Sequence, residues 1–196
     1  MSQVQAQPCY TPAEYLAIER SAPYKSEYVN GTIVAMSGAS RRHTRIAFNL
    51  AGELRPQLKG KPCTAHISDM RVKVNATGLY TYPDVIIVCG DEQFEDDAVD
   101  VLLNPTVIIE VLSPSTEHYD RGAKFAHYRR LESLMEYVLV SQEGVHIEHY
   151  ARQSDDRWLL SEVHRLEDVL ALPTVGCRIA LAEIYDQTHI RDTAEP

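Results

Sequence analysis

The spacing of apolar residues predicts three helices. Thr11-Pro12-Ala13-Glu14 is a capping box with proline at the first helical position, so a helix is expected from there to about Arg20. A second helix is expected over residues 43–58, where Pro56 should stop or bend its end. Its apolar residues recur at every fourth position: Ile46, Leu50, Leu54 and Leu58. A third helix is expected over residues 120–131.

Short apolar runs separated by turn residues predict the strands. Asn30-Gly31 lies between two such runs and is a strong signal for a tight hairpin turn. Further strands are expected over residues 63–67, 70–74, 85–88, 107–112, 136–140, 145–151 and 158–163. The acidic stretch 91–100 is interpreted as a solvated loop and residues 173–185 as a loop with a short turn. This order of elements favours an α/β fold, in α+β arrangement, with one mixed sheet flanked by helices.

Length and composition indicate a globular chain. With 196 residues, one domain is expected over residues 10–188, after an extended or disordered segment 1–9 and before a tail 189–196. The chain has no apolar run near the ~20 residues needed to cross a bilayer and no signal-like start, so a cytoplasmic protein without a membrane partner is expected. Its four cysteines are far apart, which favours buried free thiols over disulfides.

Two carboxylates occur where buried strands should be apolar. Asp84 opens the run Val85–Val88, and Glu110 interrupts the run 107–112. A buried unpaired carboxylate costs several kcal/mol, so such a group is expected to be protonated, paired or bound to a metal. For Glu110 alone a buried ion pair explains the residue, and for Asp84 alone a turn after proline does. Together the two suit a hard, oxygen-liganded cation such as Mg²⁺.

A lysine follows the second carboxylate on the expected third helix. Asp120, Lys124 and Tyr128 are four residues apart and share one helical face. Lys124 could orient a water beside a metal. An exposed Asp120–Lys124 pair, worth only about 0.3–0.5 kcal/mol, explains the same spacing equally well.

Several of these residues form a pattern that resembles the Uma-two family of restriction endonucleases. The similarity covers about residues 10–188, and the run Glu110 to Thr116 followed by Asp, Lys and Tyr at these offsets is its most specific part. The matching residues are Glu27 and Gly31 in SEYVNGTIV, His43, Pro83-Asp84, IIEVLSPST from Ile108 to Thr116, Asp120, Lys124, Tyr128, and LEDVLALP from Leu166 to Pro173.

The resemblance implies a restriction-endonuclease-like PD-(D/E)XK core that hydrolyses phosphodiester bonds with Mg²⁺ or Mn²⁺. Asp84 and Glu110 then match the acidic residues of the motif, and both would bind the metal together with the Val111 carbonyl. The motif lysine is absent, because Leu112 stands two positions after Glu110. Lys124 would replace it, and Glu27 would be a further site carboxylate or a solvated strand residue.

The expected partner is nucleic acid, with DNA favoured, bound by a homodimer because cutting both strands needs two sites. His43 and Arg45 are the candidate phosphate contacts, with Asp120 and Tyr128 as further substrate-binding residues. Basic side chains could form a track on and beside the second and third helices: Arg41, Arg42, Arg45, Arg55, Lys59, Lys61, Arg121, Lys124, Arg129 and Arg130. The net charge of −9 argues mildly against a general nucleic-acid binder. The alternative is a catalytically inactive module that binds DNA or protein.

Overall fold

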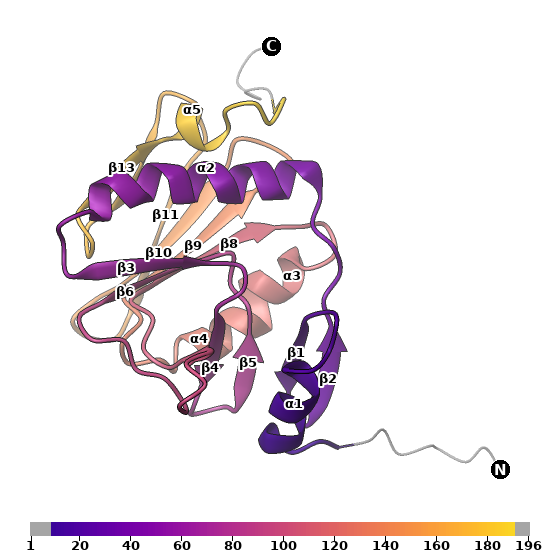
Figure 1. The fold of residues 1–196 in the computed structure, drawn as a ribbon. Coiled ribbons are helices and arrows are strands. Elements are labelled where there is room, and N and C mark those ends of the chain that lie inside the picture. Colours follow the sequence, from indigo (N-terminus) through magenta and orange to yellow (C-terminus); the bar gives the residue numbers. More distant parts are fainter. Residues whose placement is uncertain (1–8, 191–196) are drawn as a thin grey trace.

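A six-stranded mixed sheet lies at the centre of the fold, in the order β11-β10-β9-β8-β6-β3 (Figure 1). The computed structural model describes residues 9–190, so the expectations for residues 1–8 and 191–196 lie outside the described part. The elements are α1 (Pro12–Glu19), β1 (Ser26–Val29), β2 (Thr32–Ala35), α2 (Arg41–Leu58), β3 (Cys63–Ile67), β4 (Arg71–Val74), β5 (Leu79–Thr81), β6 (Val85–Cys89), β7 (Val101–Leu102), β8 (Val107–Leu112), α3 (Glu117–Tyr119), the π-helical turn η1 (Asp120–Lys124), α4 (Phe125–Tyr128), β9 (Glu136–Ser141), β10 (Ile147–Arg152), β11 (Trp158–Val163), β12 (Val169–Leu172), β13 (Cys177–Ala180) and α5 (Leu181–Ile184).

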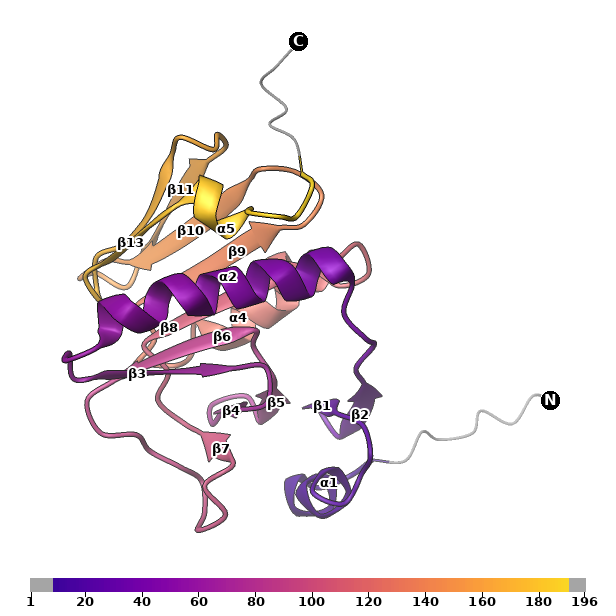
Figure 2. The same ribbon diagram turned by 45° about the horizontal axis from the view of Figure 1, so that its top comes forward.

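Both faces of the central sheet are covered. Helix α2 crosses one face (Figure 2). Its four regularly spaced apolar residues are buried there against Val85, Ile109 and Val138. The segment from α3 to α4 covers the other face, where Phe125 and Tyr128 pack on Ile108. Because β8 lies between these two layers, all six of its residues are buried. A carboxylate in β8 is therefore held inside the protein.

The N-terminal hairpin belongs to a second sheet, in the order β2-β1-β5-β4-β7. Asn30 and Gly31 form its turn with φ of 49° and 84°, as a tight hairpin requires. The capping box at Thr11 is present, and a cluster of Tyr15, Tyr28 and Tyr80 fixes α1 on this sheet. The hairpin and its sheet bring Glu27 and Thr81 towards the start of β6.

The structure corrects several expectations about the elements. Three sheets replace the expected single one, because the N-terminal hairpin joins a second sheet and β12 pairs with β13 in a third. Strand β13 lies in the stretch 173–185 that was expected to be a loop. The expected helix 120–131 begins earlier, at Glu117, and contains a π-helical turn in its middle. Strands β5 and β7 were not expected. No helix in residues 9–190 is long and apolar enough to cross a membrane.

The expectation that all cysteines are free thiols is wrong for one pair. Cys63 and Cys89 are directly opposite in the antiparallel pair β3–β6 and form a disulfide. Cys9 and Cys177 are free. The disulfide joins the edge strand β3 to the strand that carries Asp84 at its start.

We expect the Cys63→Ser/Cys89→Ser double variant to lose about 2–4 kcal/mol of unfolding free energy, because the disulfide restricts the unfolded chain over a separation of 26 residues. Urea unfolding followed by circular dichroism measures the loss, and Cys9→Ser is the control. Alkylation in denaturant should add two groups to the unreduced wild type and four after reduction. Four groups without reductant would contradict the disulfide.

Candidate active site

The two carboxylates singled out in the sequence meet at one end of the central sheet. Asp84 immediately precedes β6, and Glu110 is the fourth residue of β8. Val85 of β6 pairs with Ile109 of β8, and the two strands are antiparallel. Asp84 and Glu110 therefore occupy the next pair of opposed positions. The strand pairing therefore brings together two acids that are 26 positions apart in the chain.

Asp84 is fixed by two contacts. Its Oδ2 accepts a hydrogen bond from the Val111 amide at 2.7 Å. The same oxygen lies 3.2 Å from Nε2 of His43, in the first turn of α2. Asp84 thus connects β6, β8 and the N-terminal end of α2.

The Val111 carbonyl faces the same side as Asp84. Backbone groups of successive strand residues point to alternate neighbours, and the Leu112 carbonyl accepts from Gln142, just beyond β9. The Val111 amide points the other way, towards Asp84. Its carbonyl shares that side, so Asp84 and the Val111 carbonyl offer two oxygen donors beside Glu110.

Lys124 lies among three carboxylates. Its Nζ is 3.0 Å from Oε1 of Glu110, 3.2 Å from Oε1 of Glu27 and 3.4 Å from Oδ1 of Asp120. Only 5% of Lys124 is exposed. The buried ammonium excludes the exposed Asp120–Lys124 pair that the sequence left open.

Two hydroxyl groups hold the carboxylates in place. Tyr128 donates to Oε1 of Glu110 at 2.8 Å, and Thr81 donates to Oε1 of Glu27. The hydroxyl oxygens of Tyr128 and Thr81 lie 3.5 Å apart. The sequence did not predict Thr81 as a site residue, because its position in the site depends on the unexpected strand β5.

Burial changes the proton affinity of this cluster. Burial raises the pKa of Glu110 to about 8, against the opposing effect of the Lys124 ammonium. Burial also raises the pKa of Asp120. For Lys124 burial acts in the opposite direction, but Glu110, Glu27 and Asp120 raise its pKa well above the ordinary value. The site is thus rich in carboxylates and has one permanently charged amine.

The donor set suits a divalent metal ion. Mg²⁺ and Mn²⁺ prefer carboxylate, carbonyl and water oxygens, which Asp84, Glu110 and the Val111 carbonyl provide. Among the buried polar atoms of residues 9–190, Nδ1 of His43 and the Tyr119 hydroxyl have no hydrogen-bond partner. His43 contacts Asp84, and the Tyr119 ring centroid lies 6.0 Å from Nζ of Lys124. Unsatisfied polar groups of this kind beside a carboxylate cluster are typical of a functional site.

The other residues predicted to bind substrate lie in different places relative to the carboxylates. Asp120 and Tyr128 are buried at 3% and 0% exposure, so they support the site from behind and do not face a large substrate. Arg45 lies on α2 about half a turn after His43, on the opposite side of the helix. Its guanidinium covers the exposed Phe48 ring at 5.6 Å.

The expected basic track is not continuous. Lys124 is buried, Arg121 is paired with Glu117 and Glu148, and Lys61 donates to the carbonyls of Val175 and Gly176. Arg129 and Arg130 lie after the end of α4, beside Arg152 and Trp158. Arg41, Arg42 and Arg45 lie in the first turns of α2, the end of the helix from which His43 contacts Asp84.

Comparison with known proteins places the chain. The model of the Uma2 (Uma-two) family, described as "Putative restriction endonuclease", matches residues 12–182. The chain belongs to this family. Two of its relatives are uncharacterised proteins of Synechocystis sp. (strain ATCC 27184 / PCC 6803 / Kazusa). Protein sll1609 is 38% identical over 78% of this chain and 86% of its own length. Protein slr1290 is 36% identical over 91% of this chain and 92% of its own length.

A solved structure shows the same fold. It is described as a putative nuclease belonging to DUF820 from Anabaena variabilis ATCC 29413, and it superposes with a TM-score of 0.74 at 15% identity, over 89% of this chain and 97% of the other. The restriction-endonuclease-like fold expected for an Uma-two chain is thus confirmed, as is the family.

Proposed function

We propose that the protein is a metal-dependent endonuclease that hydrolyses phosphodiester bonds, with DNA as its substrate. One observation carries the proposal. Asp84 accepts from the backbone amide of Val111, the residue after Glu110, and a buried lysine contacts Glu110 at 3.0 Å. Family membership supports the reaction class.

In this proposal each residue has one role. Asp84, Glu110 and the Val111 carbonyl bind Mg²⁺ or Mn²⁺. When bound, the cation supplies Lewis acidity, which lowers the pKa of a water and neutralises phosphate charge. Lys124 holds a positive charge beside Glu110 and stabilises negative charge that develops on the substrate.

The remaining residues position these groups. Glu27 and Asp120 hold the Lys124 ammonium between them, and Tyr128 orients Glu110. His43 approaches Asp84 from α2 and can reach a phosphate at the mouth of the site. Asp120 and Tyr128 therefore take a positioning role in place of substrate contact.

Binding of a metal and cleavage test the proposal together. Calorimetric titration should show Mn²⁺ binding to the wild type and much weaker binding to Glu110→Gln, which keeps the acceptor for Tyr128. A panel of single- and double-stranded DNA and RNA, with Mg²⁺ and with Mn²⁺, should show cleavage of DNA. Cleavage of RNA alone would show that the proposed substrate is wrong and that the proposed reaction, phosphodiester hydrolysis, is right.

A catalytically inactive binding module is the second candidate. It is favoured by Leu112 at the motif lysine position and by the engagement of Lys124 with three carboxylates, which leaves its charge internally balanced. This alternative predicts that calorimetric titration with Mn²⁺ gives no heat of binding above background. DNA retention without metal binding would select it.

The nucleic-acid surface is expected at the start of α2. Arg41, Arg45 and Phe48 lie within two helical turns of His43 and form one shallow, partly aromatic surface. We expect Arg41→Ala/Arg45→Ala to weaken DNA binding roughly tenfold and to make the salt dependence of log K shallower by about 1–2. Fluorescence anisotropy with Ca²⁺ in place of Mg²⁺ measures both quantities.

Arg55→Ala/Lys59→Ala is the matched control, since it removes the same charge from the other end of the same helix. Equal losses in the two double variants would mean that α2 contributes only general charge and does not contact DNA through its N-terminal end.

We also propose a homodimer, because a double-strand cut needs two sites. Sedimentation at micromolar concentration should give twice the monomer mass of 22.1 kDa. A monomer, with or without DNA, would restrict the activity to nicking or to single strands.

A further inference from the structure

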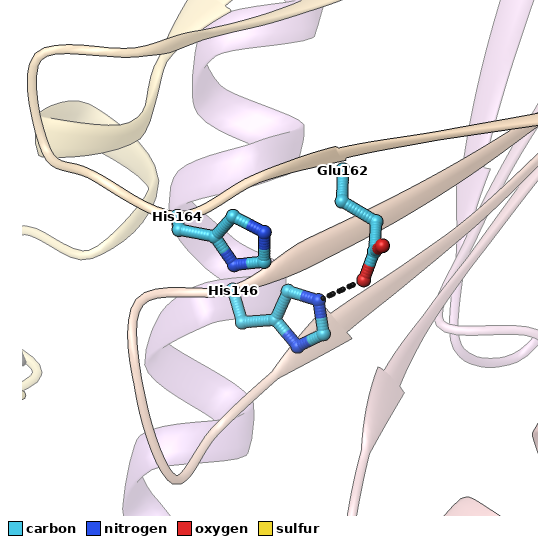
Figure 3. A group of neighbouring side chains, drawn as sticks. All are labelled: His146, Glu162 and His164. Atoms are coloured by element: carbon cyan, nitrogen blue, oxygen red, sulfur yellow. Dashed lines mark hydrogen bonds and ion pairs between the residues drawn. The ribbon is translucent and has the colours of Figure 1, made fainter.

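A second group of metal-binding side chains lies at the outer edge of the central sheet. Nitrogen atoms of His146 and His164 and a carboxylate oxygen of Glu162 all lie within 4.8 Å of one another (Figure 3). In residues 9–190 this is the one group of three such residues brought together in this way. None of the three belongs to the candidate active site.

The strand register explains the arrangement. Ile147 pairs with Val163 in the antiparallel pair β10–β11, so His146 and His164 occupy the next opposed positions. Their rings stack with centroids 4.7 Å apart. Glu162 precedes His164 by two residues, and residues two apart in a strand point to the same face. All three side chains therefore gather on one face, with Glu162 accepting from His146 at 2.9 Å.

The backbone around His146 is fixed. The Tyr185 hydroxyl accepts from the His146 amide at 3.1 Å and donates to its carbonyl at 2.9 Å. The Ser141 amide also donates to that carbonyl at 3.0 Å. His146 is therefore anchored, whereas His164 and Glu162 are exposed enough to rotate about their side-chain bonds.

We propose that His146, Glu162 and His164 bind a first-row transition cation, with Zn²⁺ as the preferred ion. Two imidazoles and one carboxylate are typical zinc ligands, and three protein ligands leave a fourth position open to water or another ligand. Tetrahedral zinc places its donor atoms about 3.3 Å apart, so the donors approach each other from at most 4.8 Å by side-chain rotation. The cation replaces the hydrogen bond between His146 and Glu162.

This site differs in chemistry from the proposed nuclease centre. Imidazole nitrogen selects Zn²⁺ over Mg²⁺, whereas the oxygen donors around Glu110 suit Mg²⁺. Millimolar Mg²⁺ should therefore occupy the oxygen site and leave the histidine site to Zn²⁺. The two sites can be tested separately, and failure of one leaves the other intact.

The experiment is a calorimetric titration of chelator-treated full-length protein with Zn²⁺ in the presence of millimolar Mg²⁺. A Cys9→Ser background removes the exposed thiol that competes for zinc. We expect one equivalent to bind, with at least about tenfold weaker binding in His146→Asn, His164→Asn and Glu162→Gln. Wild-type NMR spectra should show the His146 and His164 ring protons shifting together, which tests the site without any substitution.

His66→Asn is the matched control. His66 pairs with Glu92 at the opposite edge of the same sheet, on β3, where the described residues provide no third ligand. This variant should bind Zn²⁺ like the wild type. Unchanged zinc binding in a folded His146→Asn/His164→Asn variant would overturn the proposal, and so would displacement of Zn²⁺ by millimolar Mg²⁺.

Discussion

Asp84→Asn should abolish metal-dependent cleavage while leaving the fold intact. The loss is expected to reach about 10³-fold or more, since a catalytic metal contributes several kcal/mol of charge stabilisation. Asparagine has nearly the same shape and still accepts a hydrogen bond from the Val111 amide, which Asp84 accepts at 2.7 Å. The variant therefore removes the charge that binds the cation and keeps the contact that orients the residue.

Cleavage of a labelled DNA duplex with Mg²⁺ and with Mn²⁺ measures the effect, and thermal unfolding checks the fold. Asp69→Asn is the control, because Asp69 is an exposed carboxylate that pairs with Lys25 at the surface. A folded Asp84→Asn protein that cleaves at the wild-type rate in clean preparations would falsify the role of Asp84 as a metal ligand.

The elements that were predicted well are those whose apolar pattern in the sequence matches the residues that are buried in the fold. The run in β8 is apolar because layers cover both faces, and its bounds agree with the expected residues 107–112. Helix α2 buries Ile46, Leu50, Leu54 and Leu58, the four residues that revealed it. In both cases the pattern is dictated by packing against a layer that extends over the whole element.

Elements that depend on pairing with another strand were missed. Strand β12 has alternate buried residues, Leu170 and Leu172, but its four residues become a strand only by pairing with β13. The Cys63–Cys89 disulfide follows from the register of β3 and β6, which sequence spacing does not reveal. Short strands and cross-strand pairs require the tertiary fold to be known first.

The candidate site shows the same division. Glu110 was evident because a carboxylate interrupted an apolar strand, and Asp84 because it preceded one. The contacts from His43 to Asp84 and from Thr81 to Glu27 join separate elements. The sequence indicated which residues could carry charge in the interior, but the fold decides which of them meet.

Lys124→Met should destabilise the protein more than any other single change at the site. Removal of one partner of a buried ion pair costs about 3–5 kcal/mol, because the remaining charge is left without compensation. Here the ammonium contacts Glu27, Glu110 and Asp120, so its loss leaves three carboxylates together. Methionine fills a similar volume, which limits any effect of an empty cavity.

The loss should depend on pH in a defined direction. In the wild type the pKa of Glu110 is already raised to about 8 from its ordinary value of 4.5. Lys124 lowers the pKa of Glu110 and of Asp120, so both pKa values rise further without it, and the folded variant binds protons that the unfolded chain releases. The Glu110 contribution to stability falls in both proteins as pH rises from about 4.5 to about 8, and above about 8 it continues to fall only in the variant. We therefore expect the difference from wild type to be larger at high pH than at low pH, and to shrink when Mn²⁺ supplies positive charge.

Urea unfolding at several pH values, without and with Mn²⁺, measures this difference. Lys73→Met is the matched control, because Lys73 is a partly exposed lysine paired with Glu95 and should cost only about 1 kcal/mol. Lys124→Arg keeps the charge and should recover much of the stability. If Lys124→Met costs no more than Lys73→Met and its effect is independent of pH, the ammonium is not the charge that holds these carboxylates together, and the proposed site loses its only interior cation among the described residues.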